Sequence, residues 1–493
     1  MAKQKVINSE DDKVAVGAKD NSSGLGMWAL AGVVVSSMIG GGIYSLPQNM
    51  AAGASVGAVL LAWLITGIGV CFIANTFRIL SVVKPDLKAG IYMYSREGFG
   101  QYAGFTIGWS YWLCQICGNV GYAVITMDAL NYFFPPYFAG GNGIYSILGG
   151  SILIWGFNFL VLKGIHAATL VNLIGTVAKI VPLIFFIIVM MVFFHADKFA
   201  FDFWGEGALN LGDLPKQIKG TMLVTLWAFI GIEGAVVMSQ HAKNPQVVGK
   251  ATMLGFMGSL MIYVLLSVLP YGVMGQAEIA KLPNPSTAAL LEPVVGKFGA
   301  DFMNIGLLLS VLTSWLAWTM VTAQIPQAAA KDGTFPKEFQ IESQKHTPVF
   351  SLYVTSFVMQ LFMLLVYFSN NAWNTMLSIT SVMVLPAYLA SALYLWKICE
   401  DHEYPLNFYI RRSTALLCGM GASLYAFWMI YAAGLSYLLM AIIFMTLGIP
   451  VFMYARHQIA PEERIFTKPE KCVAWLLVLV ALFAIYAMVY HIV

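Results

Sequence analysis

Long apolar stretches, separated by short polar ones, follow one another along almost the whole chain. A helix needs about 20 apolar residues to cross the hydrocarbon core of a bilayer. We expect membrane helices at residues 27–52, 55–81, 104–131, 143–163, 167–194, 220–240, 250–274, 299–328, 348–368, 373–397, 413–433, 435–455 and 470–492. The strands of a membrane barrel would instead show segments of about ten residues with alternating polarity, which the sequence lacks. The pattern predicts an all-α polytopic membrane protein with about 13 transmembrane helices.

Composition supports the same class. Hydrophobic residues make up 59% of the chain and charged residues only 10%, whereas a soluble globule needs about twice that share of charge. Most of the 27 lysines and arginines fall in alternate segments between the spans, those that are cytoplasmic if the N-terminus is cytoplasmic. We therefore expect residues 1–26 to form a disordered cytosolic tail and, with thirteen spans, the C-terminus to lie outside. The net charge of +3 fits attraction to the inner leaflet, and no nucleic-acid partner is implied.

Signatures of enzymes are absent from the sequence. It contains no Walker A loop, no His-Glu-x-x-His zinc motif and no pair of aspartates in neighbouring spans. Cys114 and Cys117 form a Cys-x-x-Cys pair in mid-span without partner histidines, so we expect unpaired packing cysteines and no metal site. The sequence predicts a protein that is not an enzyme and carries no cofactor.

Three consecutive glycines, Gly40, Gly41 and Gly42, and the nearby Pro47 stand inside the first predicted span. Each glycine destabilises a helix by about 1 kcal/mol relative to alanine, so we expect the helix to open here. Free backbone groups at bilayer depth are tolerated where they line a polar cavity or are buried in protein. In transporters that cavity is the substrate site.

Two ionisable residues lie inside predicted spans. Glu233 stands between Gly231 and Gly234 in the sixth span, so this helix is also expected to break, five spans after the first. Breaks in spans 1 and 6 are typical of an inverted five-plus-five repeat. Lys179 lies in the fifth span, where a charge costs at least about 2.5 kcal/mol and is expected to face the protein interior. The alternative is that both residues merely snorkel or neutralise each other.

Several of these segments resemble one known family. They are the glycine-rich run 37–47, Tyr111-Trp112 with Cys114 and Asn119, the segment 227–233 (Trp-Ala-Phe-Ile-Gly-Ile-Glu) and the loop 330–333 (Ala-Lys-Asp-Gly). They resemble the basic amino acid and polyamine antiporters of the amino acid–polyamine–organocation (APC) superfamily, over spans 1 to 12. Segments 45–51, 84–87 and 176–179 are most similar to the bacterial arginine/ornithine exchanger branch.

The resemblance implies a five-plus-five inverted-repeat (LeuT-like) transporter fold with unwound helices 1 and 6. We expect residues 27–194 to form the first repeat, 220–397 the second, and 413–492 the additional helices. By the same resemblance the protein is expected in the bacterial inner (cytoplasmic) membrane, with a possible homodimer through spans 11 and 12.

The resemblance also assigns roles to the opened helices. Backbone N–H groups of Gly40, Gly41 and Gly42 would bind the substrate α-carboxylate, and a Cβ there would block its approach. In acid-resistance relatives a serine takes the place of Gly41, so a hydroxyl donor is missing here. Backbone carbonyls from Ala228 to Ile230 would accept hydrogen bonds from the α-ammonium group.

Aromatic and polar side chains complete the expected substrate site. Trp227 and Trp318 match family positions at which an indole stacks on the substrate side chain, and cations bind well on indole faces. One face of the third span carries a polar stripe that is unsuited to lipid. Its members are Tyr111, Gln115, Asn119 and Tyr122, with Gln115 standing where a smaller residue is usual.

Coupling is expected at the two ionisable positions. Glu233 matches the acidic residue proposed in the family to sense protons and couple substrate to gating. Lys179 corresponds to a lysine that takes the place of the second sodium ion in some relatives, which argues against sodium coupling. Ser314 and either Thr380 or Ser381 are expected to be hydroxyl neighbours of the site.

We therefore expect a secondary antiporter that exchanges an external cationic amino acid, arginine-like, for its intracellular product, ornithine-like, by alternating access. Amino acid/amine exchange such as histidine/histamine is the alternative within this class. From another class, an amino-acid sensor would bind without counterflow, and a channel would conduct without saturating. The expected partners are small amino acids and the lipid bilayer.

Overall fold

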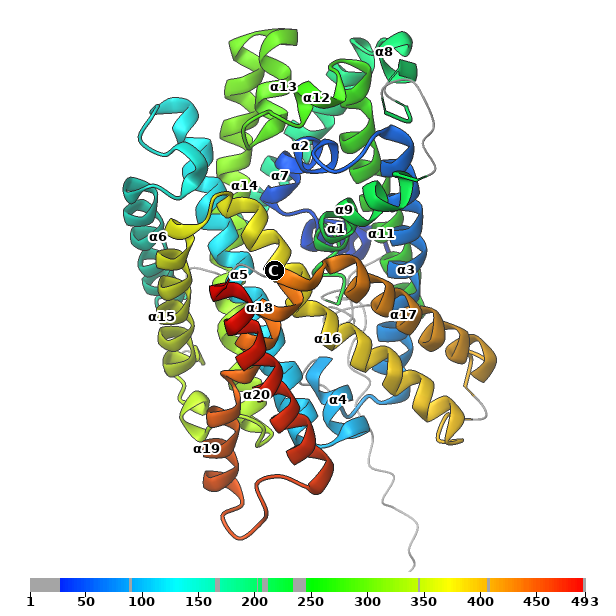
Figure 1. Ribbon diagram of the computed structural model, residues 1–493, viewed down its shortest axis with the longest axis vertical. Coiled ribbons are helices and arrows are strands. Elements are labelled where there is room, and N and C mark those ends of the chain that lie inside the picture. The colour runs from blue at the N-terminus through cyan, green and yellow to red at the C-terminus, as the bar shows by residue number, and fades with distance from the viewer. Residues whose placement is uncertain are drawn as a thin grey trace, which may run out of the picture.

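The computed structural model describes residues 27–87, 91–164, 169–201, 203–205, 212–233, 245–344, 346–405 and 408–490. Within these ranges the chain consists of helices and their connections, and its one strand-like pairing is an isolated bridge between Glu342 and Pro348. The helices form a single bundle (Figure 1). The predicted all-α class is confirmed.

Eleven helical stretches of the described chain are long and apolar enough to cross a membrane. They are α3 (Val56–Val83), α5 (Gln101–Phe133), α6 (Ile144–Leu162), α7 (Thr169–Val192), α11 (Pro245–Val268), α14 (Lys297–Lys331), α15 (Val349–Leu365), α16 (Ala372–Glu400), α17 (Arg412–Ala433), the successive α18 (Leu435–Thr446) and α19 (Ile449–Ile459), and α20 (Lys468–Val489). Each falls on one of the spans expected from the sequence. The two expected spans not among them are the first and the sixth, so the total of thirteen stays a prediction.

The first expected span is not one continuous helix. Two residues separate helix α1 (Met27–Met38) from the 3₁₀ helix η2 (Gly41–Ser45), which leads into α2 (Leu46–Ala51). Gly40, between them, has an extended backbone with φ −98° and ψ 175°. The interruption falls at the glycine run, where helix stability is lowest.

The sixth expected span begins as α9 (Leu214–Trp227) and continues in turns through residue 233. Within these turns Gly231 has a φ of +106°, a left-handed backbone that glycine adopts without a steric penalty. Residues 234–240 of the expected span lie outside the described part of the chain. Helical conformation is therefore lost near the middle of both the first and the sixth span.

Shorter helices occupy the connections between spans. They are α4 (Ile91–Phe99), α8 (Ala196–Phe201), α12 (Gln276–Ile279), α13 (Ser286–Val295), η3 (Ala139–Gly141), η6 (Leu269–Gly272), η7 (Lys337–Gln340) and η8 (Val366–Phe368). Asp332 fixes α4 against the C-terminal end of α14. Its Oδ2 accepts a hydrogen bond from the Tyr92 hydroxyl (2.5 Å), and its Oδ1 pairs with Arg96 Nη1 (3.1 Å).

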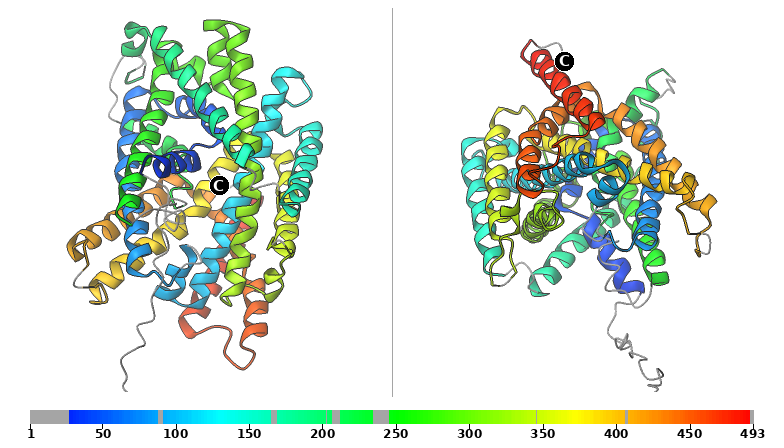
Figure 2. Two further views of the ribbon diagram at one scale, coloured as in Figure 1. Left: turned by 180° about the vertical axis from the view of Figure 1, so that it is seen from behind. Right: turned by 90° about the horizontal axis from the view of Figure 1, so that it is seen from below.

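Helices α5 and α16 are the most buried of the spans. They pack on each other, and α5 also packs along α14, whereas α16 packs along α17. Views from behind and from below show the helices packed together in one bundle (Figure 2). The centre therefore places side chains of α5, α14 and α16 beside the two interrupted helices.

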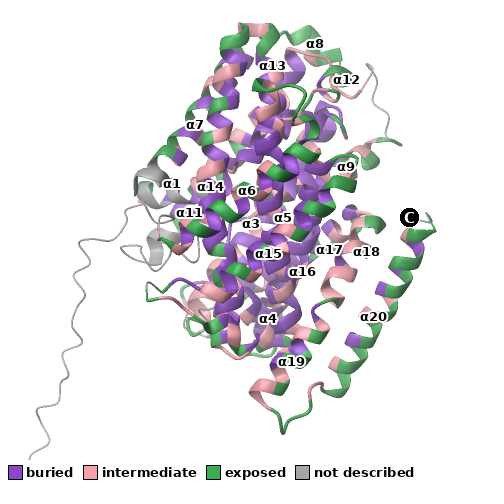
Figure 3. Cartoon of the chain, turned by 90° about the vertical axis from the view of Figure 1, so that its left-hand side faces the viewer, coloured by how far each residue is buried: buried purple, intermediate pink, exposed green. Residues whose placement is uncertain are grey.

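Helix α20 lies at the edge of the bundle and is mostly exposed (Figure 3). It packs on α18 and buries alanines such as Ala481 and Ala484, while large apolar side chains such as Leu479 and Phe483 face outward. An apolar exposed face is what a helix needs where lipid is the solvent. One polar contact ties its start to the core, because Glu470 Oε1 accepts a hydrogen bond from the backbone N–H of Tyr102 (3.0 Å).

Candidate functional site

A cavity lies where the two interrupted helices meet the bundle centre. Its empty volume is about 630 Å³, part of which is open solvent. Its lining comes from α1, α5, α9, the turns after α9, α14 and α16. The residues are Met38, Gly40, Gln115, Cys117, Gly118, Asn119, Gly121, Tyr122, Trp227, Ala228, Ile230, Trp318, Trp373, Met376, Leu377 and Thr380.

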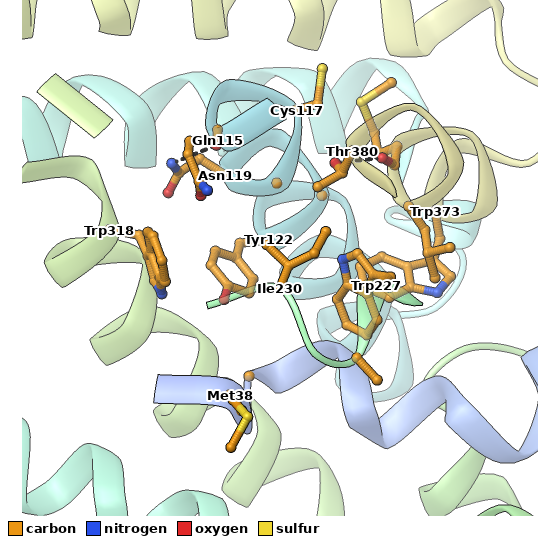
Figure 4. Close-up of a pocket in the computed structure, with 16 residues that line it drawn as sticks. Met38, Gln115, Cys117, Asn119, Tyr122, Trp227, Ile230, Trp318, Trp373 and Thr380 are labelled. Atoms are coloured by element: carbon orange, nitrogen blue, oxygen red, sulfur yellow. Dashed lines mark hydrogen bonds between the residues drawn. The ribbon is translucent and has the colours of Figure 1, made fainter. Parts of the chain in front are cut away.

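Aromatic rings form two walls of this cavity. Trp318 and Tyr122 lie together on one side, Trp227 and Trp373 lie on the other, and Ile230 lies between the walls (Figure 4). The described lining contains no acidic side chain. A positive charge in this cavity therefore meets π faces, which attract cations by about 0.5–2 kcal/mol each, in place of a carboxylate.

Polar groups are concentrated on α5. Asn119 is almost fully buried, and its Nδ2 donates to the backbone oxygen of Gln115 (2.9 Å) and to Thr322 Oγ1 (2.9 Å). The Asn119 Oδ1 atom has no partner among the described residues. A buried polar group without a partner is costly, so an N–H group brought close to this oxygen would be favourable.

The carboxylate of Glu233 is held just outside the cavity by three donors. The hydroxyl of Tyr111 donates to Oε1 (2.7 Å), the hydroxyl of Tyr388 donates to Oε2 (2.8 Å), and the N–H of Gly231 donates to Oε2 (3.2 Å). These contacts join α5 and α16 to the turns that follow α9. Tyr111 belongs to the predicted polar stripe but contacts Glu233 and is not part of the cavity lining.

The glycine run contributes one residue to the cavity. A Cβ built on Gly40 would lie 3.0 Å from the Tyr122 hydroxyl oxygen, whereas one on Gly41 would lie 1.9 Å from Val311 Cγ2. A Cβ on Gly42 would lie 2.1 Å from Cη2 of Trp227. Gly41 and Gly42 are thus close-packed against neighbouring side chains, a reason for glycine that the sequence did not indicate.

Lys179 connects α7 to the first interrupted helix. Its Nζ donates to the backbone oxygen of Ser36 (3.1 Å), two residues before α1 ends. Nearby, the hydroxyl of Tyr44 in η2 donates to the backbone oxygen of Ala178 (2.9 Å). The ammonium of Lys179 therefore bridges α1, in the first span, and α7, the fifth span, which is the contact predicted for it.

The structure brings together most of the predicted site. The predicted residues that line the cavity are Gly40, Gln115, Asn119, Tyr122, Trp227, Ala228, Ile230 and Trp318. Those placed outside the lining are Gly41, Gly42, Tyr111, Lys179, Glu233 and Ser314. The hydroxyl of Ser314 donates to the backbone oxygen of Ser310 in its own helix (2.7 Å).

Helix α16 contributes four lining residues, Trp373, Met376, Leu377 and Thr380. Of the two hydroxyl neighbours expected there, Thr380 lines the cavity, whereas Ser381 donates to the backbone oxygen of Leu223 (2.9 Å). Trp373 was not predicted, because nothing in its local sequence distinguishes it from an interface tryptophan. Its signal is tertiary, since the start of α16 is brought against the end of α9.

Comparison with known proteins identifies the family. The family model described as amino acid permease matches residues 25–451. The chain belongs to the amino acid permease family. The predicted resemblance to basic amino acid antiporters of the APC superfamily is confirmed, and this permease is a multi-pass transporter and not an enzyme.

The permease is similar over nearly its whole length to proteins named arginine/agmatine antiporter. It is 60% identical over 470 residues to the one from Chlamydia pneumoniae, covering 94% of this chain and 97% of that relative. It is 59% identical over 466 residues to the one from Chlamydia caviae, covering 94% and 96%. The relative from Chlamydia trachomatis serovar D is 58% identical over 463 residues, covering 94% and 96%.

Proposed function

We propose that this permease exchanges arginine for agmatine, the amine left when arginine loses its carboxyl group. The observation that carries the proposal is the aromatic cavity between the two interrupted helices, with its free amide oxygen and without an acidic residue in its described lining. The names of relatives about 60% identical over nearly their whole length support this pair. The ornithine expected from the sequence is replaced by agmatine as the proposed partner.

Both proposed ligands present the same groups to the aromatic walls. Each has a planar guanidinium group on a short aliphatic chain, which stacks well on the indoles of Trp227 and Trp318. Asn119 Oδ1, which is buried and has no partner among the described residues, would accept an N–H of the guanidinium group. Since these contacts do not involve the carboxylate, they serve arginine and agmatine alike.

The α-carboxylate distinguishes the two ligands, and its proposed contact is weak. Among the three glycines of the run, Gly40 is the one that lines the cavity, and position 41 supplies no hydroxyl. Carboxylate binding would then rest on backbone N–H groups alone. A site that gains little from the carboxylate loses little when agmatine, which has none, takes its place.

Glu233 and Lys179 are proposed to couple binding to alternating access. Glu233 ties the turns after α9 to Tyr111 and Tyr388 on the central helices, and Lys179 ties α7 to Ser36 on α1. A bound ligand adds contacts to both interrupted helices and so favours their joint movement, whereas the empty carrier reorients slowly. A fixed ammonium at this bridge makes a sodium ion unnecessary there.

The proposed orientation follows the distribution of basic residues. We place the permease in the cytoplasmic membrane with its N-terminus in the cytoplasm and its C-terminus outside. Arginine would then enter and agmatine would leave.

Counterflow in proteoliposomes tests the proposal. Vesicles containing the purified full chain are loaded with agmatine, ornithine, histamine or no amine, and uptake of labelled arginine is followed from outside. We expect fast, saturable uptake into agmatine-loaded vesicles and slow uptake into empty ones. Uptake driven by ornithine but not by agmatine would overturn the proposed pair. Equal uptake into empty vesicles would indicate a uniporter or channel, and binding without uptake in any vesicle would indicate a sensor.

A further inference from the structure

Trp373 is a buried residue of the cavity wall to which the contacts proposed above give no role. It is the second residue of α16 and is 3% exposed. In Figure 4 it lies beyond Trp227 when the cavity is viewed from Trp318. Its place behind a substrate-facing indole suggests that it acts on that indole.

The two indoles meet edge to face. The ring centroids of Trp227 and Trp373 are 5.4 Å apart, and their planes form an angle of 85°. This is one of the two arrangements that aromatic quadrupoles favour. Each ring therefore restricts the rotation of the other.

Trp227 needs such support because of where it stands in the chain. It is the last residue of α9, and residues 228–233 after it are turns. On that side its backbone is held by a single turn, in which the N–H of Ile230 donates to the Trp227 backbone oxygen (3.1 Å), and α9 does not continue. The orientation of its indole therefore depends on the side chains packed against it.

Both rings converge on Gly42 of η2. A Cβ built on Gly42 would lie 2.1 Å from Cη2 of Trp227 and 2.4 Å from Cη2 of Trp373, so the contact has no room for a methyl group. On its other side Trp373 faces Gly121 of α5, where an added Cβ would lie 3.6 Å from its Cζ3. Trp373 is thus seated on the central helix and reaches both interrupted helices.

We propose that Trp373 is a positioning residue that holds the indole of Trp227 in the orientation that binds the substrate side chain. It acts through Trp227, and the contact at Gly42 ties this orientation to the first interrupted helix. The proposal rests on the proposed function only in taking Trp227 as a substrate contact. It predicts that the effect of losing Trp373 disappears when Trp227 is absent.

A double-mutant cycle tests this dependence. Arginine and agmatine binding to the purified full-length permease is measured by calorimetry for the wild type, Trp373→Ala, Trp227→Ala and the double variant. We expect Trp373→Ala to weaken both ligands about three- to tenfold, as loss of one aromatic pair would. In the Trp227→Ala background the same change should alter Kd by less than about twofold.

Two further variants separate positioning from folding. The Trp373 Nε1 atom has no partner among the described residues, so Trp373→Phe removes no protein hydrogen bond and keeps a ring edge for Trp227. Trp373→Leu keeps apolar bulk without a ring. We expect phenylalanine to recover most of the affinity and leucine to recover little. Comparing the phenylalanine and leucine variants tests the positioning role of Trp373 even if Trp373→Ala does not fold.

The outcomes are distinguishable. Fold-changes that multiply in the double variant would show that Trp373 contacts the substrate by itself, and equal affinities for the phenylalanine and leucine variants would show simple packing; either result overturns the proposal. If Trp227→Ala leaves binding unchanged, or the wild type does not bind arginine, the proposed substrate site itself fails. Wild-type affinity in Trp373→Leu would also contradict the positioning role.

Discussion

Replacing Trp318 by alanine should weaken arginine binding by about 0.5–2 kcal/mol, or roughly two- to thirtyfold in Kd. Trp318 projects from α14 toward the cavity, and the described lining has no carboxylate that would compensate for a lost cation–π contact. The lower end of the range applies where water still reaches the indole, and the upper end where the ligand excludes it. Trp318→Phe should recover part of the loss, because phenylalanine offers a ring face with weaker attraction for a cation.

The assay compares arginine with citrulline, which has nearly the same shape but a neutral end group. Both ligands are titrated into the purified permease and its variants by calorimetry. A cation–π contact predicts that Trp318→Ala weakens arginine more than citrulline. Trp315→Phe is the matched control, since Trp315 lies one helical turn earlier, fully buried against Phe157 at 5.0 Å between ring centroids. It should leave both affinities unchanged.

Two results would refute this reasoning. Unchanged arginine affinity in Trp318→Ala would show that the indole is a packing residue. An equal loss for arginine and citrulline would show that the ring contributes shape or gating and that charge is recognised elsewhere, with Glu233 and the polar groups of α5 as the nearest candidates.

Three other changes test the interrupted helices and their supports. Gly42→Val should abolish uptake while the protein still inserts, because the new side chain has no space beside the indoles; normal uptake with normal membrane levels would argue against this packing. Lys179→Ala should sharply reduce turnover, because the hydrogen bond to Ser36 is lost. The wild type should keep full activity when choline replaces sodium, and a strict sodium requirement would contradict the role proposed for Lys179. Asp332→Asn should destabilise the permease by about 1–3 kcal/mol, because it weakens the ion pair with Arg96. A thermal-shift assay should show a lower unfolding midpoint, and an unchanged midpoint would contradict a stabilising role for Asp332.

The spans were predictable because the bilayer admits only continuous apolar helices or closed barrels, so hydropathy and length determine most of the architecture. The glycine run also predicted where the first helix stops, and α1 ends at Met38, two residues before it. The reason for glycine at positions 41 and 42 could not be predicted from the sequence. The contacts of Gly41 with Val311 and of Gly42 with Trp227 depend on helices far away in the sequence.

The polar stripe of the third span shows the same limit. Helical periodicity placed four residues on one face, and Gln115, Asn119 and Tyr122 do line the cavity. Tyr111 shares that face but bonds Glu233 instead, because periodicity defines a direction around the helix and not how far the cavity extends along it. Trp373 carried no local signal at all, since its role depends on where α16 begins relative to α9.

The central claim, exchange of arginine for agmatine, is tested most directly by its charge movement. Agmatine carries one positive charge more than arginine at neutral pH, because it lacks the carboxylate. Each cycle of arginine entry and agmatine exit therefore moves one net positive charge outward. We predict that an inside-positive potential accelerates arginine uptake into agmatine-loaded proteoliposomes, that an inside-negative potential slows it, and that arginine/arginine exchange responds to neither. Arginine uptake into agmatine-loaded vesicles that is insensitive to the potential, or that does not exceed uptake into empty vesicles, would contradict the account.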